Sequence, residues 1–170
     1  MKTKRLIKIL VVLLLVGVNI SCDQISKTEA RQRIAENQII EVIDSNLILT
    51  RVENTGAALS MGENLPPALK VLILQIFPII VLLGLLWYII RDPNVTKLQL
   101  FAFTCIIGGG VGNIIDRIRF NSVTDFMYVE IGSLHTGIFN MADVSVTFGV
   151  ILILVLSMVK GIREKFKVSF

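Results

Sequence analysis

Long apolar runs alternate with polar segments along this chain, and four of the runs have the length of a membrane span. They cover roughly residues 6–25, 68–90, 98–115 and 139–159. Each is close to the ~20 apolar residues that a helix needs to cross the hydrocarbon of a bilayer. The pattern predicts an all-α membrane protein with four transmembrane helices, folded as a single polytopic domain over residues 1–170.

The composition agrees with lipid as the solvent. Hydrophobic residues make up 54% of the chain and charged residues only 18%, and the mean hydropathy of +0.75 is far above that of a soluble domain. The net charge of +4 would suit nucleic acid, but the cations cluster at the ends of the apolar runs. We therefore interpret this charge as a topology signal and expect no nucleic-acid partner.

An N-terminus in the cytoplasm satisfies the positive-inside rule. The cytoplasmic segments then hold two acids, Asp92 and Glu164, against ten cations: Lys2, Lys4, Arg5, Lys8, Arg91, Lys97, Lys160, Arg163, Lys165 and Lys167. Residues 26–67 and 116–138 then face the extracytoplasmic side. We expect both termini in the cytoplasm and any chemistry at the outer surface of the membrane.

The N-terminal run also resembles a lipoprotein signal peptide, because cations in Lys2–Arg5 precede an apolar run that ends at Ser21 and Cys22. Such a signal carries Leu or a similar residue three positions before the cysteine, where this chain has Asn19. We expect the run to remain as the first span, with lipidation of Cys22 as the alternative. Cys105 lies about 10 Å inside the third span at the opposite membrane side, so a disulfide with Cys22 is not expected.

A short segment between the first two spans has the pattern of strands. β-Branched residues dominate Ile39–Ile43 and Leu47–Val52, and the turn-forming cluster Asp44–Asn46 separates them. An isolated two-stranded hairpin is only marginally stable in water. We expect a small extracytoplasmic β-cradle over about residues 39–63 that rests on the membrane or on the helices and receives a substrate.

The third apolar run is rich in glycine. Gly108 and Gly112 are four residues apart, which permits close approach of a neighbouring helix. We expect most glycines of this run to serve packing.

Polar side chains near the outer ends of the spans are candidates for function, since ionisable groups at bilayer depth are costly. Asp23 and Lys27 are four residues apart and share one helix face. A structural ion pair explains them as well as function does. Asn54 and Gly56 lie in a polar turn whose small residues would let a backbone approach a ligand, although an ordinary turn is the alternative.

Two further groups lie at the outer ends of the third and fourth spans. Asn113, Asp116 and Arg117 share a helix face, so an amide, a carboxylate and a guanidinium lie together. Asn140 and Asp143 share a face at the start of the fourth span. Asp143 has no cation in its own segment, which is hard to reconcile with a solvated charge.

A pair of aspartates is the strongest candidate for chemistry. Asp125 and Asp143 are 18 residues apart, and the short outer connection between the third and fourth spans can bring them together. Two carboxylates in a poorly solvated site share a proton, so that one acts as a base and the other as an acid. This suits amide hydrolysis by water. The alternative is structural: the aspartates cap the fourth helix and bind Arg117.

Other catalytic chemistries have less support. His135 is the only histidine, and the chain has neither a His-Glu-x-x-His motif nor a cysteine pair with zinc spacing. A serine and histidine site would depend on His135 without a recognisable nucleophile elbow. We expect no metal and no cofactor.

Five motifs carry a resemblance to a known family, in the right order and across most of the chain. They are Asp23-Gln-Ile-Ser-Lys27, Glu53-Asn-Thr-Gly-Ala-Ala58, Gly112-Asn-Ile-Ile-Asp-Arg117, Val123-Thr-Asp-Phe126 and Phe139-Asn-Met-Ala-Asp143. Together they resemble the motif set of lipoprotein signal peptidases, also called signal peptidase II, aspartic peptidase family A8. Val144 departs from the pattern, because many members have serine at that position, and this puts the local hydrogen bonding in doubt.

The resemblance implies a metal-free aspartic endopeptidase of the bacterial inner membrane that cleaves diacylglyceryl-modified prolipoproteins immediately before the lipidated cysteine. It implies that Asp125 and Asp143 are catalytic. It places a polar shell for substrate binding at Asp23, Lys27, Asn54, Gly56, Asn113, Asp116, Arg117 and Asn140. The implied partners are prolipoproteins, membrane lipids and globomycin-like inhibitors, and we expect a monomer.

Two rival classes remain open at this point. An inactive binding protein or small transporter could use the aspartates to bind a cation or relay protons, although a transporter is expected to show corresponding patterns in two halves, and this sequence shows none. A protease of the presenilin kind would carry Gly-x-Gly-Asp, whereas Gly110-Val111-Gly112 is followed by Asn113.

Overall fold

The computed structural model describes residues 2–43, 46–57 and 60–167 and contains the four predicted spans. They are α1 (Lys2–Arg33), a second span built from α2 (Pro67–Val71), the π-helical segment η2 (Leu72–Ile76) and α3 (Phe77–Arg91), then α4 (Lys97–Phe120) and α5 (Met141–Lys167). Each span is long and apolar enough to cross a membrane, which confirms the expectation of a multi-pass membrane protein.

The π-helical segment has a local cause. Pro78 has no amide hydrogen to donate to the carbonyl of Leu74. Because this hydrogen bond is missing, the helix widens to π geometry over Leu72–Ile76, immediately before the turn that contains Pro78. The span continues through this irregularity to Arg91, so the break in the hydrogen-bond ladder does not end the helix.

Two helices extend beyond the apolar runs that predicted them. α1 continues to Arg33 rather than Ile25, and α4 continues to Phe120 rather than Ile115. Hydropathy marks where lipid contact ends, whereas the helix continues for as long as its polar side chains find partners within the protein. Asn121 caps the end of α4, and its left-handed conformation (φ 57°) turns the chain directly toward the next strand.

The β-cradle has two more strands than expected. β1 (Ile40–Ile43) and β2 (Leu47–Asn54) form the predicted hairpin, and β3 (Val123–Ile131) and β4 (Leu134–His135) complete an antiparallel sheet in the order β1-β2-β3-β4. Asp44 and Ser45 of the predicted turn lie outside the described residues. Pairing with β3 ties the hairpin to the segment between the third and fourth spans, which explains how a marginal hairpin is held.

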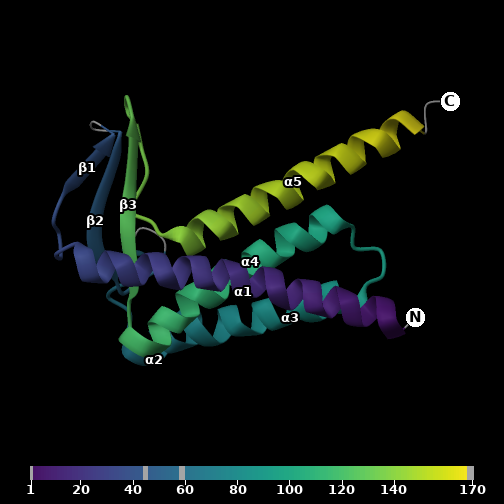
Figure 1. Cartoon of the computed structure of the whole chain (residues 1–170), viewed down its shortest axis with the longest axis horizontal. Coiled ribbons are helices and arrows are strands. Elements are labelled where there is room, and N and C mark those ends of the chain that lie inside the picture. Colours follow the sequence, from purple (N-terminus) through teal and green to yellow (C-terminus); the bar gives the residue numbers. More distant parts are fainter. Residues whose placement is uncertain (1, 44–45, 58–59, 168–170) are drawn as a thin grey trace.

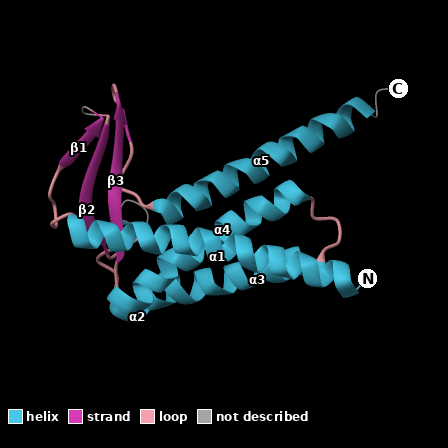
Figure 2. Cartoon of the chain, in the orientation of Figure 1, coloured by secondary structure: helices cyan, strands magenta, loops and turns pink. Residues whose placement is uncertain are grey.

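The sheet stands at one end of the helices, and the beginning of α1 and the end of α5 lie toward the opposite end (Figure 1, Figure 2). Large apolar side chains are exposed on the sheet and immediately before it: Ile39, Val42, Ile43, Ile131 and Leu134. Exposed apolar groups of this kind suit a membrane interface better than open water.

The bundle is held by close packing around α4. Val12, Leu82, Ile89, Ile107 and Ile114 form a buried apolar cluster between the helices. A Cβ atom on Gly112 would lie 2.5 Å from Oδ2 of Asp23, so only glycine lets α1 approach α4 at this level. This confirms the packing role expected for the glycines, and it brings the polar face of α1 against α4.

Candidate active site

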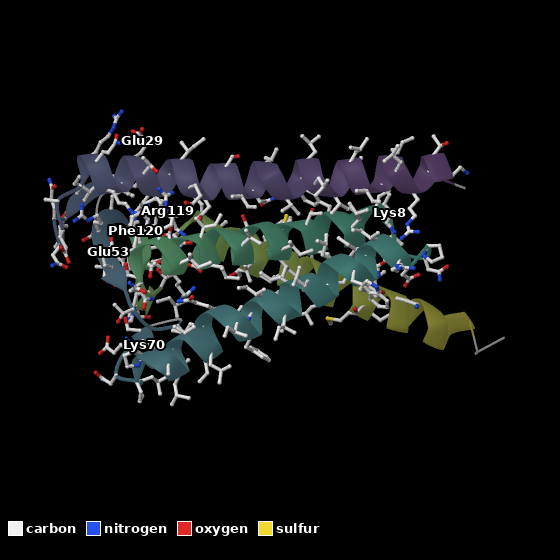
Figure 3. The ribbon with its side chains drawn as sticks, turned by 90° about the horizontal axis from the view of Figure 1, so that it is seen from below. Lys8, Glu29, Glu53, Lys70, Arg119 and Phe120 are labelled. Atoms are coloured by element: carbon white, nitrogen blue, oxygen red, sulfur yellow. The ribbon has the colours of Figure 1, made fainter. Side chains whose placement is uncertain are left out.

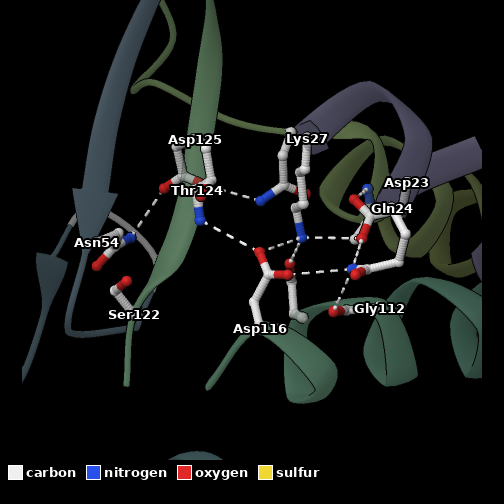
Figure 4. Close-up of polar contacts among 12 residues, drawn as sticks. Asp23, Gln24, Lys27, Asn54, Gly112, Asp116, Ser122, Thr124 and Asp125 are labelled. Carbon is white, nitrogen blue, oxygen red and sulfur yellow. Dashed lines mark hydrogen bonds and ion pairs between the residues drawn. The ribbon is translucent and has the colours of Figure 1, made fainter. Parts of the chain in front are cut away.

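Asp125 lies at the end of the bundle, on β3, where that strand pairs with β2. Val52 is its partner across the two strands, and Asp125 is only 5% exposed. Two amides donate to its carboxylate: Nδ2 of Asn54 to Oδ2 at 3.0 Å and Nδ2 of Asn140 to Oδ1 at 2.6 Å. Figure 4 shows the contact with Asn54. Each carboxylate oxygen therefore has a fixed donor, and the orientation of the group is set by side chains from two other segments.

Burial raises the pKa of Asp125 to about 6, and the negative charge of Asp143 acts in the same direction. The hydrogen bonds from Asn54 and Asn140 favour the ionised form and limit the increase. A carboxyl with this pKa can hold a proton close to neutral pH, as a general acid must.

Asp143 lies in the first turn of α5 and is half-buried. Its Oδ1 accepts from Nδ2 of Asn113 at 2.9 Å and its Oδ2 from the backbone amide of Asn140 at 3.1 Å. The backbone amide of Asp143 in turn donates to Oδ1 of Asn140 at 3.0 Å. This reciprocal pair is a capping box, and the helix N-terminus favours a negative charge at this position.

The two aspartates share one neighbour. Asn140 donates to Asp125 through its side chain and to Asp143 through its backbone, so both carboxylates are fixed relative to the same residue. The doubling back of the chain that was expected from the sequence thus takes place through β3, β4 and the start of α5. Val144, the position that departs from the family pattern, has an exposed side chain.

A buried cluster of charges lies beside the aspartates. Lys27, Asp23 and Asp116 are fully buried, and Nζ of Lys27 lies 2.9 Å from Oδ2 of Asp23 and 3.2 Å from Oδ2 of Asp116. Nη2 of Arg31 lies 2.8 Å from the same oxygen of Asp116. Two cations thus balance two carboxylates, as buried charges require. The contacts of Lys27 and Asp116 are visible in Figure 4.

The carboxylate of Asp116 has its partners on another helix. It pairs with Lys27 and Arg31 of α1, whereas the sequence indicated only that Asp116 shares a face of α4 with Asn113 and Arg117. Adjacent residues on a helix point about 100° apart, so the packing of α1 against α4 decides the partner.

The charged cluster reaches the aspartate pair through Lys27. Its ammonium donates to Oδ1 of Asn113 at 2.8 Å, and Nδ2 of Asn113 donates to Asp143. The carbonyl of the Asn113 amide is occupied by Lys27, so the amide must present its nitrogen to the carboxylate. Lys27 thus fixes the orientation of the Asn113 amide, and through it the contact between Asn113 and Asp143.

Sequence reasoning missed several members of this network. Nε2 of Gln24 donates to Asp23, to the carbonyl of Gly112 and to Asp116, each at 3.1 Å. Arg31 follows Asp23 and Lys27 by further steps of four, and this repeated spacing was the signal that could have identified it.

A second missed group connects the cluster to the sheet. The backbone amide of Thr124 donates to Asp116 at 3.3 Å, and Nε of Arg31 donates to the Thr124 hydroxyl at 2.8 Å. That hydroxyl donates to Oε1 of Glu53 at 2.9 Å, and Ser122 donates to Oε2 at 2.8 Å. These bonds fix the start of β3, and hence the position of Asp125, relative to α1 and α4.

The turn after β2 contacts both Asp125 and α4. The backbone amide of Gly56 donates to Oδ1 of Asn54 at 2.9 Å, and its carbonyl accepts from Nη2 of Arg117 at 3.0 Å. A Cβ atom on Gly56 would lie 2.6 Å from the carbonyl oxygen of Ser60, so the turn requires glycine. Nε of Arg117 is buried and has no hydrogen-bond partner among the described residues. Ala58 of this motif lies outside the described residues.

The geometry thus places every predicted site residue at one end of the bundle, in two connected groups around Asp125 and Asp143. Over the described ranges, no three side chains of His, Cys, Asp and Glu come together as metal ligands would. Asp143 lies close enough for its charge to raise the pKa of Asp125, and two carboxylates in unequal surroundings of this kind are suited to divide the roles of acid and base.

The family model for signal peptidase (SPase) II matches residues 14–159. The chain is 32% identical over 152 residues to the lipoprotein signal peptidase of Streptococcus pneumoniae (strain ATCC BAA-255 / R6), which covers 89% of this chain and 92% of that protein. It is 30% identical over 153 residues to the lipoprotein signal peptidase of Syntrophus aciditrophicus (strain SB), with 90% and 94% covered.

Two solved structures have a similar fold. Both are described as bacterial membrane enzyme structures by the in meso method, one at 2.3 Å and the other at 1.9 Å resolution. The first has a TM-score of 0.78 at 30% identity and covers 87% of both chains. The second has a TM-score of 0.76 at 29% identity, with 86% of this chain and 91% of the other covered.

Proposed function

The chain belongs to the signal peptidase II, or lipoprotein signal peptidase, family, and from that premise we propose that it cleaves bacterial prolipoproteins by an aspartic mechanism. Its substrates are diacylglyceryl-modified prolipoproteins, and the bond cut is the one immediately before the lipidated cysteine. One observation carries the mechanism: Asn140 holds Asp125 and Asp143 together at the end of a four-span bundle.

The two carboxylates have different surroundings, which assigns their roles. Asp125 is nearly fully buried and has a raised pKa, so it carries the shared proton at the start of the reaction. Asp143 accepts hydrogen bonds at a helix N-terminus and starts as the carboxylate. Unequal environments of this kind separate an acid from a base.

In the first step, Asp143 takes a proton from water while the water oxygen attacks the scissile carbonyl carbon. Asp125 gives its proton to the carbonyl oxygen, and a neutral tetrahedral diol forms. In the second step, Asp125 takes a proton from one hydroxyl of the diol, and Asp143 protonates the leaving amine as the C–N bond breaks. The pair regains its starting state with one proton.

The surrounding groups serve binding and orientation. Nε of Arg117 is buried without a hydrogen-bond partner among the described residues, and Nη2 binds the Gly56 carbonyl. Together these groups can align a peptide backbone beside the aspartates. The position of Asp143 is fixed by Asn113, which is held by Lys27. Lys27 is in turn held by Asp23 and Asp116. No step requires a metal or a cofactor.

The proposed location follows from the charge distribution. The segments with ten cations against two acids lie in the cytoplasm, so both termini face the cytoplasm and the aspartates face outward. The lipidated cysteine of a prolipoprotein lies at that outer surface of the inner membrane. The apolar side chains exposed on the sheet support contact with membrane lipids and with the lipidated segment of the substrate. We further propose that the enzyme is a monomer that globomycin-like peptides inhibit.

The decisive test is incubation of the purified protein with a diacylglyceryl prolipoprotein and, separately, with the unlipidated form of the same prolipoprotein. The reaction with the lipidated form is repeated in the presence of a chelator. We expect cleavage of the lipidated protein alone, unchanged by the chelator. Cleavage of both forms would contradict the proposed specificity, and loss of activity with the chelator would contradict the aspartic mechanism.

A further inference from the structure

A cavity of about 1010 Å³ opens at the end of the bundle opposite the aspartates. It lies between the start of α1, the end of α3, the α3–α4 connection and the start of α4. Figure 3 shows Lys8 at this end, whereas Glu53 and Lys70 lie at the other. The aspartate site leaves this cavity without a role.

The residues that line the cavity divide into a cationic rim and an apolar floor. The rim carries Lys4, Arg5, Lys8, Arg91 and Lys97, and the twelve lining residues within the described chain include no carboxylate. Nζ of Lys8 donates to the carbonyl of Asp92 at 2.8 Å, which ties the α3–α4 connection to α1 and keeps the rim together. Five cations on one rim would repel one another unless an anion lies between them.

The floor has the chemistry of an acyl chain site. Val11 and Leu15 line it from α1, and Ile90 and Leu100 line it from α3 and α4. Leu15 is seven residues along α1 from Lys8, so the floor extends roughly 10 Å from the rim toward the middle of the span. An occupant must therefore be anionic at one end and apolar along its length.

We propose that this cavity binds one anionic phospholipid of the leaflet at that side of the membrane. Its phosphate oxygens accept from the rim lysines and arginines, and an acyl chain lies along the apolar floor. Arginine provides a planar fork for phosphate and lysine a compact charge, and basic pockets between transmembrane helices bind anionic headgroups by such contacts. The bound lipid would also neutralise the rim and hold the start of α1 against the α3–α4 connection.

The chain contains its own reporter for this site. Trp87 is its only tryptophan and is 64% exposed. It precedes Arg91 by four residues, so it lies on the same side of α3 and about 6 Å deeper in the membrane. The acyl chain of a lipid held at Arg91 therefore passes near the indole, and bromine atoms on that chain would quench its fluorescence.

The experiment uses the full chain in phosphatidylcholine nanodiscs that contain increasing fractions of brominated phosphatidylglycerol or of brominated phosphatidylcholine. We expect quenching of Trp87 at a several-fold lower fraction of the anionic lipid than of phosphatidylcholine. Replacing Lys8, Arg91 and Lys97 together by Gln should remove this preference. Lys70→Gln, which removes one cation at the opposite end, should keep it.

A variant that leaves every charge unchanged distinguishes a lipid bound in the cavity from anionic lipids that are only attracted to the cations. Val11→Phe keeps every cation but fills the floor, and it should also remove the preference. Equal quenching by both lipids in the wild type would overturn the proposal, as would a preference that survives in Val11→Phe or in the triple variant. Fluorescence does not depend on peptidase activity, so failure here leaves the proposed function untouched, and retained cleavage shows that each variant is folded.

Discussion

Asn140 and Asp143 exchange two hydrogen bonds, from the backbone amide of each residue to the side chain of the other. A common helix-capping device therefore also sets the position of one carboxylate of the proposed pair. The side-chain nitrogen of Asn140, Nδ2, donates to Oδ1 of Asp125 at 2.6 Å. Asn140 thus combines a local structural role with a role in the site, and the two can be separated by mutation.

Asn140→Ser should separate them. Serine caps helices about as well as asparagine, so Asn140→Ser should lower the free energy of unfolding in detergent less than Asn140→Ala, since only the alanine variant also loses the cap. Its shorter side chain cannot donate to Asp125, and kcat for prolipoprotein cleavage should fall. Asn140→Ala removes both functions and should lose both stability and rate. Equal melting and equal turnover of the serine variant and the wild type would show that the contact with Asp125 has no role in catalysis.

The pH profile should report the raised pKa of Asp125. Because Asp125 must carry a proton in the free enzyme, kcat/KM should fall as the pH rises through about 6. Asn54 donates to the ionised carboxylate, so Asn54→Ala should raise that pKa further and move this limb of the profile to higher pH. A limb that stays in place in Asn54→Ala would assign it to another group.

The same pKa has a consequence for stability. A carboxyl whose pKa is higher in the folded state stabilises the fold below its unfolded pKa, and this contribution is lost as the pH rises through about 6. At neutral pH the ionised Asp125 therefore costs on the order of 3 kcal/mol. The melting temperature of Asp125→Asn relative to the wild type should increase between pH 4 and pH 8. A constant difference across this range would contradict the assignment.

Removal of the buried lysine should destabilise the protein strongly. Lys27→Met leaves Asp23 without its cation and Asp116 with Arg31 alone, and breaking a buried pair typically costs about 3 to 5 kcal/mol. The matched control is Arg33→Met, which breaks the exposed pair with Glu29 on the same helix and should cost less than about 1 kcal/mol. Similar melting temperatures for the two variants would contradict a structural role for the buried charges.

Much of this architecture is visible in the sequence because it depends on local patterns. The four spans follow from apolar runs of sufficient length, and the partnership of Asp23 and Lys27 follows from their spacing on one helix. The close approach of a neighbouring helix at Gly108 and Gly112 also follows from the sequence, and the structure identifies that helix as α1.

The remaining features depend on long-range contacts. The strand propensity of β3 was present in Val123–Ile131, but its pairing with β2 joins residues about 70 to 80 positions apart, and no local pattern selects that partner. The pairing of Asp116 with Lys27 and Arg31 likewise depends on the rotation of α1 against α4. The catalytic role of the aspartates remains a prediction that the geometry supports and activity measurements must test.

That test is the substitution of each aspartate by asparagine. Asp125→Asn and Asp143→Asn preserve shape, but an amide can neither take a proton from water nor return one to the leaving amine. General acid–base catalysis is typically worth about 10² to 10⁴-fold per group, so each variant should nearly abolish cleavage. The double variant should be hardly worse than either single variant, because both carboxylates act on one shared proton and their effects are not additive.

Turnover is measured by the gel shift of a lipidated prolipoprotein in detergent micelles, with Asp116→Asn as the comparison. Asp116 contacts α1 rather than the reacting atoms, so its loss should lower stability or rate without eliminating turnover. Near-normal turnover in either Asp125→Asn or Asp143→Asn, or single effects that multiply in the double variant, would show that the two groups do not form one catalytic unit.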